Sequence, residues 1–386
     1  MKNLILLFSV IIISLQSLLD FVSHTAAENI TADSVSTVTI SFVGDLMCHT
    51  PQLEYSKACR DSFDFNPSFR EIKKYLLSSD LTLGNLETTI SGRESIYSGY
   101  PLFNTPDSYL SALKDAGFKL LFTANNHALD RGKKGVLRTI EKINANKMIP
   151  VGTFISDRDR DSIRIMEING IRIAFLAYTF GMNGNYISSK EKYLVNVIDT
   201  NIIKKDIWNA RSKGTDAVVI YFHFGDEYSH TPSEYQKSIV RFAEKYGADI
   251  IIGSHPHSIQ PGEYFQSSKN NIGKGLVVYS LGNFLSNQRW RYSDAGMILK
   301  IKLEKNCFSG KTRLSDVAVN TTWIFKGNTG VKNEFVILPV DTAPKDEYTF
   351  LTQSDREKMA QANRDTRIIL ENILAPQSEQ LNQKNK

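Results

Sequence analysis

Acidic, amide and imidazole side chains recur along this sequence, each time directly after a short apolar run. In open α/β sheets, ligands gather beyond the carboxyl ends of strands, so side chains in such loops can meet at one edge. Carboxylates, an amide oxygen and imidazoles together form a ligand set that suits Zn, Mn, Fe or Co. The sequence therefore predicts a divalent-metal site at strand ends. Its candidate residues are Asp45, Glu87, Asn126, His127, His223, His255 and His257.

Each of these signals is weak when taken alone. A Gly-Asp pair such as Gly44-Asp45 is usually a turn, and a single histidine such as His223 is more often a hydrogen-bonded structural residue than a ligand. His255 and His257 give a stronger signal, since alternate residues of an extended segment project to one face. Their shared position after apolar runs carries the prediction, rather than any one motif.

The elements that must position these residues follow one repeated pattern: an apolar run, a polar loop and an amphipathic helix. Runs that are apolar at every position suit strands covered on both faces. The Asn169-Gly170 pair between alternating runs predicts a β-hairpin. We therefore expect an α/β sandwich with some antiparallel pairing rather than a purely parallel sheet. The expected strands are 38–43, 81–83, 120–122, 171–178, 217–222, 250–252, 276–279 and 295–303, and the expected helices are 67–77, 106–116, 133–146, 200–211, 232–246 and 355–374.

Residues 1–27 have the pattern of a leader. Lys2 precedes an apolar run from Leu4 to Leu15, and the small residues Thr25, Ala26 and Ala27 follow. This pattern is typical of a cleaved signal peptide, and a retained N-terminal membrane anchor is the alternative. Both interpretations predict that the mature chain works outside the cytoplasm, in the periplasm or at the cell surface.

Composition excludes other classes of function. With 46 basic and 41 acidic residues, the net charge is +5, which is mild for 386 residues and argues against a dedicated nucleic-acid binder. Three cysteines cannot form a disulfide scaffold. In an oxidising compartment Cys48 and Cys59 could close a loop, or they could be inert thiols or, beside His49, take a metal role. Cys307 is expected to be a small buried hydrophobe.

Six blocks, taken in order, resemble the bacterial capsule-synthesis protein CapA family. That family is associated with poly-γ-glutamate capsule synthesis and export, and it resembles the calcineurin-like metallophosphoesterases in fold. The resemblance implies a sandwich of two mixed β-sheets flanked by helices over residues 38–303, followed by an extension, 304–386, with one helix and a polar tail. The blocks are Gly44-Asp45-Leu46-Met47, Asn85-Leu86-Glu87, Ala124-Asn125-Asn126-His127, His223-Phe224-Gly225-Asp226-Glu227-Tyr228, His255-Pro256-His257 and Tyr279-Ser280-Leu281-Gly282-Asn283-Phe284.

The resemblance also implies roles for single residues. Asp45 and Glu87 match the two acidic metal ligands, with Glu87 as the bridging carboxylate, and Asp45 is also expected at the catalytic centre. His127 matches the residue that contacts a substrate oxygen or protonates a leaving group. The remaining ligands are expected to be Asn126, His223, His255 and His257.

One position departs from the metallophosphoesterase pattern. Those enzymes use Asp-x-His in the first block, whereas Met47 stands here, as it does in the CapA family. We therefore expect one or two divalent ions, of Zn, Mn or Fe. His49 is a possible replacement ligand, and this stays open. Asp226 or Glu227 is expected either to orient an imidazole or to be a solvated loop residue.

A basic and aromatic cluster follows the last block. Arg289 and Arg291 flank Trp290 and, with Asn283, are expected to bind substrate; the alternative is that they are exposed loop charges. The same two interpretations apply to the basic residues after His127, namely Arg131, Lys133 and Lys134.

The leading functional hypothesis is an extracytoplasmic protein that acts in synthesis, export or processing of poly-γ-glutamate or a similar acidic polymer, with membrane-bound capsule synthesis proteins as partners. If it is catalytic, it is a metal-dependent hydrolase of an amide or a phosphoester. The alternatives are a periplasmic metal-dependent phosphoesterase and a non-enzymatic capsule-assembly component with a structural metal.

Overall fold

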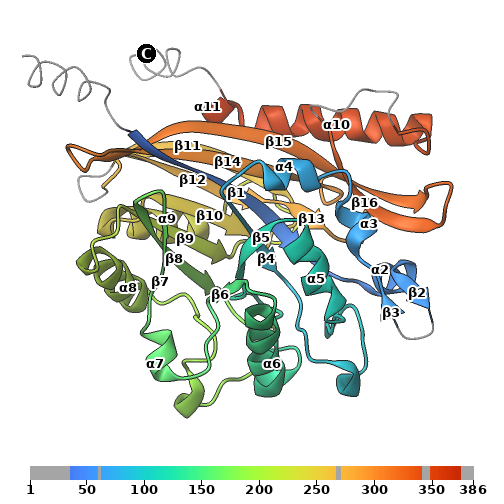
Figure 1. Cartoon of the computed structure of the whole chain (residues 1–386), viewed down its shortest axis with the longest axis horizontal. Helices are drawn as coiled ribbons and strands as arrows, with labels where there is room; N and C mark the ends of the chain where they lie inside the picture. The colour runs from blue at the N-terminus through green and yellow to red at the C-terminus, as the bar shows by residue number, and fades with distance from the viewer. Residues whose placement is uncertain (1–34, 60–61, 267–270, 341–347, 375–386) are drawn as a thin grey trace, which may run out of the picture.

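The computed structural model describes residues 35–59, 62–266, 271–340 and 348–374. The expected leader, 1–27, and the polar tail lie outside these residues. Within them, two mixed β-sheets pack face to face and helices cover their outer faces (Figure 1). The α/β sandwich of two mixed sheets flanked by helices is thereby confirmed.

The first sheet joins the parallel N-terminal strands to an antiparallel C-terminal half. Over the described residues its order is β16-β15-β14-β1-β4-β5-β6, and β13 pairs with β1. Strands β1, β4, β5 and β6 run parallel, whereas β14, β15 and β16 are antiparallel to their neighbours. The bounds are β1 Val35–Leu46, β4 Leu81–Leu86, β5 Phe118–Phe122, β6 Ile149–Val151, β13 Asn283–Leu285, β14 Ala295–Asn306, β15 Thr312–Asn328 and β16 Asn333–Pro339.

The second sheet has four parallel strands between two antiparallel edges. Its order in the described chain is β11-β12-β10-β9-β8-β7. A separate small hairpin pairs β2 with β3. The bounds are β2 Lys57–Cys59, β3 Ser62–Phe63, β7 Arg164–Ile168, β8 Ile171–Thr179, β9 Ala217–His223, β10 Ile250–Ser254, β11 Ile259–Gln266 and β12 Lys274–Leu281.

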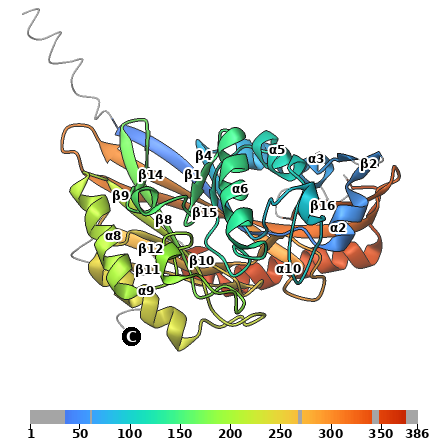
Figure 2. The same ribbon diagram turned by 90° about the horizontal axis from the view of Figure 1, so that it is seen from below.

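The helices bury their apolar stripes against the outer faces of the two sheets. Helices α8 and α9 cover the second sheet, whereas α5 covers the first. Seen from below, α8 and α9 lie on one side of the molecule and α3 and α5 on the other (Figure 2). The bounds are α2 Thr50–Tyr55, α3 Asn66–Phe69, α4 Lys73–Leu77, α5 Ser108–Asp115, α6 Gly132–Ala145, α7 Asp157–Arg160, α8 Thr200–Ser212, α9 Glu234–Tyr246, α10 Gln353–Ile369 and α11 Glu371–Leu374. Among the described residues, no helix has both the length and the apolar character that a bilayer crossing requires.

Most predicted elements are present, with some differences. One of them is that the single helix expected over 355–374 is two helices, α10 and α11. The hairpin is confirmed: Ile168 pairs with Ile171, and Asn169 and Gly170 both have positive φ, at 52° and 74°. The single helix expected over 67–77 is instead two short helices, α3 and α4, separated by a turn. Strands β15 and β16 were not anticipated, and they extend the first sheet into the stretch expected to follow the domain.

Of the alternatives open for Cys48 and Cys59, the disulfide is wrong and the inert thiol is confirmed for Cys48, and the expected burial of Cys307 is wrong. Cys48 is a buried thiol, whereas Cys59 is exposed on β2, and the two are not joined. Burial raises the pKa of Cys48 to about 12, which makes it an inert thiol. Cys307 is exposed rather than buried, because it lies in the turn after β14.

Candidate metal centre

The carboxyl ends of strands from both sheets meet at one place. In the first sheet, β1 and β4 are parallel and Asp45 pairs with Asn85, two residues before Glu87. The backbone N–H of Glu87 donates to the Leu46 carbonyl at 3.1 Å, which keeps the start of this loop against β1. In the second sheet, the last residues of β9 and β10, His223 and Ser254, are register partners. The sheet packing therefore brings carboxylates from one sheet to imidazoles from the other.

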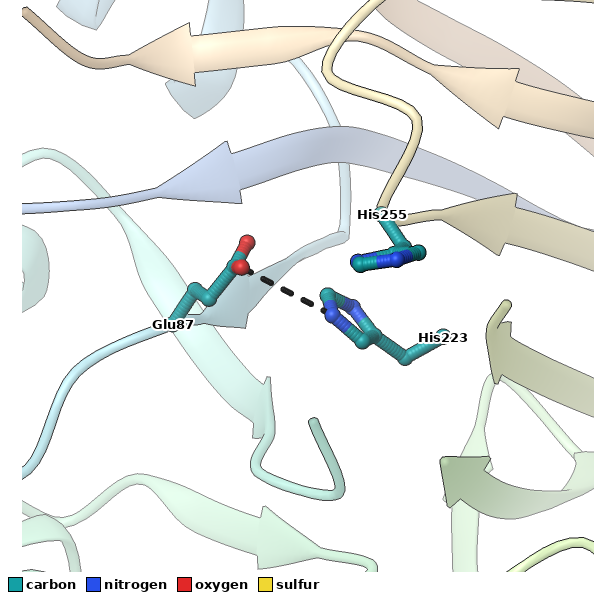
Figure 3. A group of neighbouring side chains, drawn as sticks. All are labelled: Glu87, His223 and His255. Carbon is teal, nitrogen blue, oxygen red and sulfur yellow. Dashed lines mark ion pairs between the residues drawn. The ribbon is translucent and has the colours of Figure 1, made fainter. Parts of the chain in front are cut away.

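Five of the predicted ligands form overlapping groups whose ligand atoms lie within 4.8 Å of one another. Glu87, His223 and His255 form one group, and Asp45, Glu87 and His257 form a second. Glu87 belongs to both, which is the position of a bridging carboxylate. All five side chains are buried. Figure 3 shows the carboxylate of Glu87 directed toward the rings of His223 and His255.

Asn126 also reaches this cluster. Its Oδ1 lies 2.9 Å from Nε2 of His223, and the same nitrogen lies 3.6 Å from Oε1 of Glu87. The amide oxygen, the carboxylate and the imidazole thus share one small volume. All six residues predicted to bind metal are consequently adjacent in space.

Glycine makes room for the turn at Asp45. The register of β1 shifts between Val43 and Asp45, and a Cβ on Gly44 would lie 1.8 Å from the Gly282 carbonyl oxygen. The N–H of Asp45 donates to that same oxygen at 3.1 Å. Any side chain at position 44 would break this approach, so Gly44 is required to aim Asp45 into the cluster.

The two histidines of the His-x-His motif sit on strained backbone. His255 has φ of 98° and His257 has φ of 54°, and both lie in the left-handed region that non-glycine residues rarely adopt. Each such residue costs about 1–3 kcal/mol and persists only where the surroundings impose it. Here the strained backbone places both rings in the cluster. The two histidines do converge, as predicted, but left-handed backbone brings them together rather than alternation along an extended segment.

Asn85 organises the cluster and was missed as a separate residue. Its Nδ2 lies 2.8 Å from Oδ1 of Asp45 and 3.2 Å from the hydroxyl of Ser254, while its Oδ1 accepts a hydrogen bond from Asn125 at 3.1 Å. The amide therefore links the two sheets. The available signal was its place two residues before Glu87, since alternate residues face the same side of a strand.

The pKa values of the two carboxyl groups, Glu87 and Asp45, are shifted in opposite directions. Burial and the nearby charge of Asp45 raise the pKa of Glu87 well above its usual value. Burial alone would also raise the pKa of Asp45, but the hydrogen bond and the electrostatic interaction with His257 hold that pKa well below its usual range. The pair thus consists of a permanent anion and a carboxylate that needs a positive partner to ionise.

Two of the imidazoles, those of His223 and His255, are held in the neutral form that metals bind. Burial and the adjacent His255 lower the pKa of His223 well below its usual value. Burial and His257 lower the pKa of His255 to about 3. Neutral imidazole is the ligand form, so this environment favours coordination near neutral pH.

Two buried atoms in the cluster have no hydrogen-bond partner among the described residues. They are Oε1 of Glu87 and Nδ1 of His255. A buried polar atom without a partner costs about 1–3 kcal/mol, and such atoms are rare in folded proteins. A carboxylate oxygen and an imidazole nitrogen are both metal donors, so the residues present fit a divalent ion.

His127 is held beside the cluster by an acid that the sequence analysis missed. Its Nδ1 lies 2.8 Å from Oδ2 of Asp130, and that oxygen also accepts the N–H of Phe103 at 2.7 Å. Nε2 of His127 faces the side chain of Asn183, whose Nδ2 lies 3.5 Å away. The His-x-x-Asp spacing was the available signal. Asp130 fixes the tautomer and the ring orientation of His127.

A family model described as "Bacterial capsule synthesis protein PGA_cap" matches residues 39–288, which contain every residue of this cluster. The chain belongs to the PGA_cap family. The resemblance inferred from the six blocks is thereby confirmed.

Two curated relatives carry related names. The chain is 29% identical over 281 residues to the capsule biosynthesis protein CapA of Bacillus anthracis, which covers 70% of this chain and 64% of that protein. It is 29% identical over 269 residues to the PGA biosynthesis protein CapA of Bacillus subtilis, which covers 69% of this chain and 68% of that protein. The chain thus spans about two thirds of the length of these relatives.

Solved structures with a similar arrangement include two metallophosphoesterase-type proteins. Haemophilus influenzae NAD nucleotidase has 13% identity and a TM-score of 0.47, over 91% of this chain and 67% of that one. The calcineurin-like phosphoesterase YfkN of Bacillus subtilis has 14% identity and a TM-score of 0.44, over 86% of this chain and 98% of that one. At these values the likeness concerns overall fold and says nothing of substrate.

The question left open at Met47 has a structural answer for the PGA_cap chain. The Met47 side chain is buried and its sulfur accepts a hydrogen bond from Ser286 at 3.7 Å. Nδ1 of His49 accepts the N–H of Asn287 at 3.3 Å. Neither residue belongs to a metal-type group within the described chain. His49 is therefore not placed as the replacement ligand.

The three predicted substrate-binding residues occupy two different settings. Asn283 is buried, and its Oδ1 lies 3.1 Å from Nδ1 of His257, so it positions that ring. Arg291 forms an ion pair with Asp365 of α10 at 2.8 Å, and Arg289 donates to the Ile324 carbonyl. Neither arginine belongs to the cluster; that they bind substrate stays a prediction.

Exposed aromatic side chains border the cluster. Phe180 lies 4.5 Å from the ring of His255, and Tyr228 lies 6.0 Å from the ring of His257. Trp290 in turn packs edge-on against Tyr228 at 5.1 Å. These three rings are 40–50% exposed, so they form an apolar border next to the buried polar cluster.

Proposed function

We propose that this protein acts outside the cytoplasm in the synthesis, export or processing of poly-γ-glutamate or a similar acidic polymer, as a metal-dependent hydrolase or transferase. The observation that supports this is the convergence of Asp45, Glu87, His223, His255 and His257 in one buried cluster, in a chain of the PGA_cap family. The names of the two CapA relatives suggest the pathway. The apolar leader supports the location, and membrane-bound capsule synthesis proteins are the proposed partners.

The cluster has ligands for one or two divalent ions, of Zn, Mn or Fe. Such an ion, when bound, lowers the pKa of a coordinated water and polarises the bond to be cleaved. Asp45, Glu87 and His257 would hold one ion, and Glu87, His223 and His255, with Asn126, would hold another. Oxygen and nitrogen donors of this kind do not favour a soft metal such as Cu(I).

The side chains around the cluster have separate tasks in this reaction. His127 donates a proton to the leaving group through Nε2, because Asp130 occupies its Nδ1. Asn85 and Asn283 hold Asp45 and His257 in position. The aromatic border limits water around the scissile bond.

The test is to incubate the purified chain with poly-γ-glutamate in the presence of Mn²⁺ or Zn²⁺ and to follow polymer length by size-exclusion chromatography. We expect shortening of the polymer that EDTA abolishes and that metal restores. A chain carrying both His223→Ala and His257→Ala is the matched control, and it should neither bind metal nor cleave. If the wild-type chain neither binds nor cleaves the polymer, the proposal is wrong.

A phosphoesterase is the second candidate, and the Asn126 contact favours it. The amide oxygen beside His223 is a ligand arrangement that also suits phosphoester substrates. Hydrolysis of a generic phosphodiester that disappears in an Asn126→Ala chain would support this reading. An intact fold and capsule production that survive the double histidine substitution would instead support a non-enzymatic assembly component.

A further inference from the structure

Glu227 lies against the metal cluster without belonging to either group described above. It is exposed, in the loop between β9 and α9. Its carboxylate and the rings of His255 and His257 form a third group, with ligand atoms within 4.8 Å of one another. Glu87, His255 and His257 each belong to two of the three groups, so Glu227 extends a single continuous cluster toward solvent.

The loop that carries Glu227 is fixed to the loop that carries the histidines. On one side of Glu227, the N–H of Phe224 donates to the Ser254 carbonyl at 3.0 Å, and on the other the N–H of Tyr228 donates to the Pro256 carbonyl at 2.7 Å. Tyr228 has φ of 64°, and its hydroxyl accepts a hydrogen bond from Gln288 at 3.2 Å. An exposed glutamate normally samples many rotamers, but here backbone contacts hold its Cα over the two imidazoles.

A second observation indicates that the group of Glu227, His255 and His257 takes a ligand. Nδ1 of His255 has no hydrogen-bond partner among the described residues, although the residue is only 4% exposed. This nitrogen is a metal donor in a ring that lies within the same group as the Glu227 carboxylate.

We propose that Glu227 is a metal ligand, and that it joins His255 and His257 in holding an ion on the solvent-facing side of the cluster. This assignment rests on the metal centre of the proposed function and goes beyond it. It gives the site a third carboxylate, whose negative charge favours occupancy by divalent ions. It also makes the solvent-facing loop a part of the site.

The experiment titrates the metal-free full chain with Mn²⁺ in a calorimeter and records the visible absorption of the Co²⁺-loaded protein. Glu227→Gln keeps the size of the side chain and removes its charge, and Asp226→Asn makes the same change at the exposed neighbour, which belongs to no group. We expect Glu227→Gln to weaken one Mn²⁺ binding event by about 10-fold or more and to alter the Co²⁺ spectrum. Asp226→Asn should match the wild type, and Glu227→Asp should recover part of the affinity.

The outcomes separate this assignment from the proposed function. If Glu227→Gln matches the wild type in Mn²⁺ affinity, stoichiometry and Co²⁺ spectrum, the assignment is wrong, even if polymer cleavage is lost. If the wild-type chain binds Mn²⁺ and cleaves no polymer while Glu227→Gln binds Mn²⁺ more weakly, the assignment stands and the proposed reaction fails. If the wild type binds neither ion, both fail together.

Discussion

Charged and aromatic side chains gather in two regions of this molecule. The regions differ in whether their buried polar atoms have hydrogen-bond or ion-pair partners. One is the metal cluster; the other is a cavity of about 120 Å³ beneath α10, whose lining includes Arg289, Arg291, Asp294 and Asp365. In the cavity, Arg291 is paired with Asp365, and Asp294 accepts the indole N–H of Trp323 at 2.8 Å. In the cluster, Glu87 and His255 keep buried atoms without a partner.

The comparison shows how a metal-binding cluster differs from a contact that holds a helix on a sheet. In the cavity, the ion pair between Arg291 and Asp365 joins α10 to the segment before β14. Buried polar atoms without a partner cost stability, as does the strained backbone at His255, and both are retained where they serve a function. In the sequence, both regions are short polar segments after strands. They can be distinguished only in the structure, by whether their polar atoms have hydrogen-bond or ion-pair partners.

The largest expected effect is loss of metal binding on Glu87→Gln. Glu87 is shared by two ligand groups, so removing its charge should abolish binding at both. Wild-type protein should gain about 2.7 kcal/mol of stability when Mn²⁺ is present at 100 times its dissociation constant. The variant should gain none. The measurement is the urea midpoint with Mn²⁺ and with EDTA.

The same variant should be at least as stable as the wild type when metal is absent. Burial and the charge of Asp45 raise the pKa of Glu87, which shows that its ionised form is disfavoured there. Glutamine removes that cost and keeps the shape. A metal-free variant that is several kcal/mol less stable than the wild type would show that Glu87 has a structural role instead.

The next effect is the pH dependence of stability in the metal-free protein. His255 has a folded pKa of about 3 against the usual 6.5, so its contribution is present above pH 6.5 and is lost as pH falls toward 3. The loss is up to about 1.4 kcal/mol for each pH unit. Glu87 has the opposite sign: its contribution is complete below its usual pKa and is lost as pH rises through the raised value.

Urea unfolding in EDTA at pH 7, 6 and 5 measures this slope. A His255→Gln chain should show a smaller loss of stability per pH unit than the wild type over that range. An Arg291→Ala chain, altered in the other region, should keep the wild-type slope. Equal slopes for wild type and His255→Gln would contradict a neutral buried His255.

The sequence predicted the strands and the ligands because both leave local signals. Runs apolar at every position identified β9 and β10, and the short segment after each run contained a histidine of the cluster. Asp130 and Asn85 were missed because their roles are contacts with other side chains, and such contacts have no periodicity. β15 was missed because its first half is a mixture of exposed and partly buried residues with no long apolar run, and its long antiparallel pairing with β14 is not visible in local pattern.

A smaller effect is expected at the acid that holds His127. Asp130→Asn removes the charge beside Nδ1 and keeps the shape, so the imidazole loses its fixed tautomer. We expect polymer cleavage to fall by about 10²-fold, within the range for general acid catalysis, with Mn²⁺ affinity unchanged. The measurements are kcat on poly-γ-glutamate and an Mn²⁺ titration of the same variant. A variant that loses metal as well would show that Asp130 supports the cluster instead.

The smallest effect is expected in the α10 cavity. The Arg291 side chain is 54% exposed and pairs with Asp365, and exposed ion pairs contribute about 0–1 kcal/mol. Arg291→Ala should therefore lower the free energy of unfolding by less than about 1 kcal/mol and leave Mn²⁺ affinity unchanged. Polymer binding separates the two regions: if the ion pair is the whole role of Arg291, binding stays at the wild-type level, and Asp365→Ala reproduces the small loss of stability. Weaker polymer binding in Arg291→Ala but not in Asp365→Ala would instead place the acidic polymer across both regions, because the arginine would then contact a carboxylate that α10 does not provide.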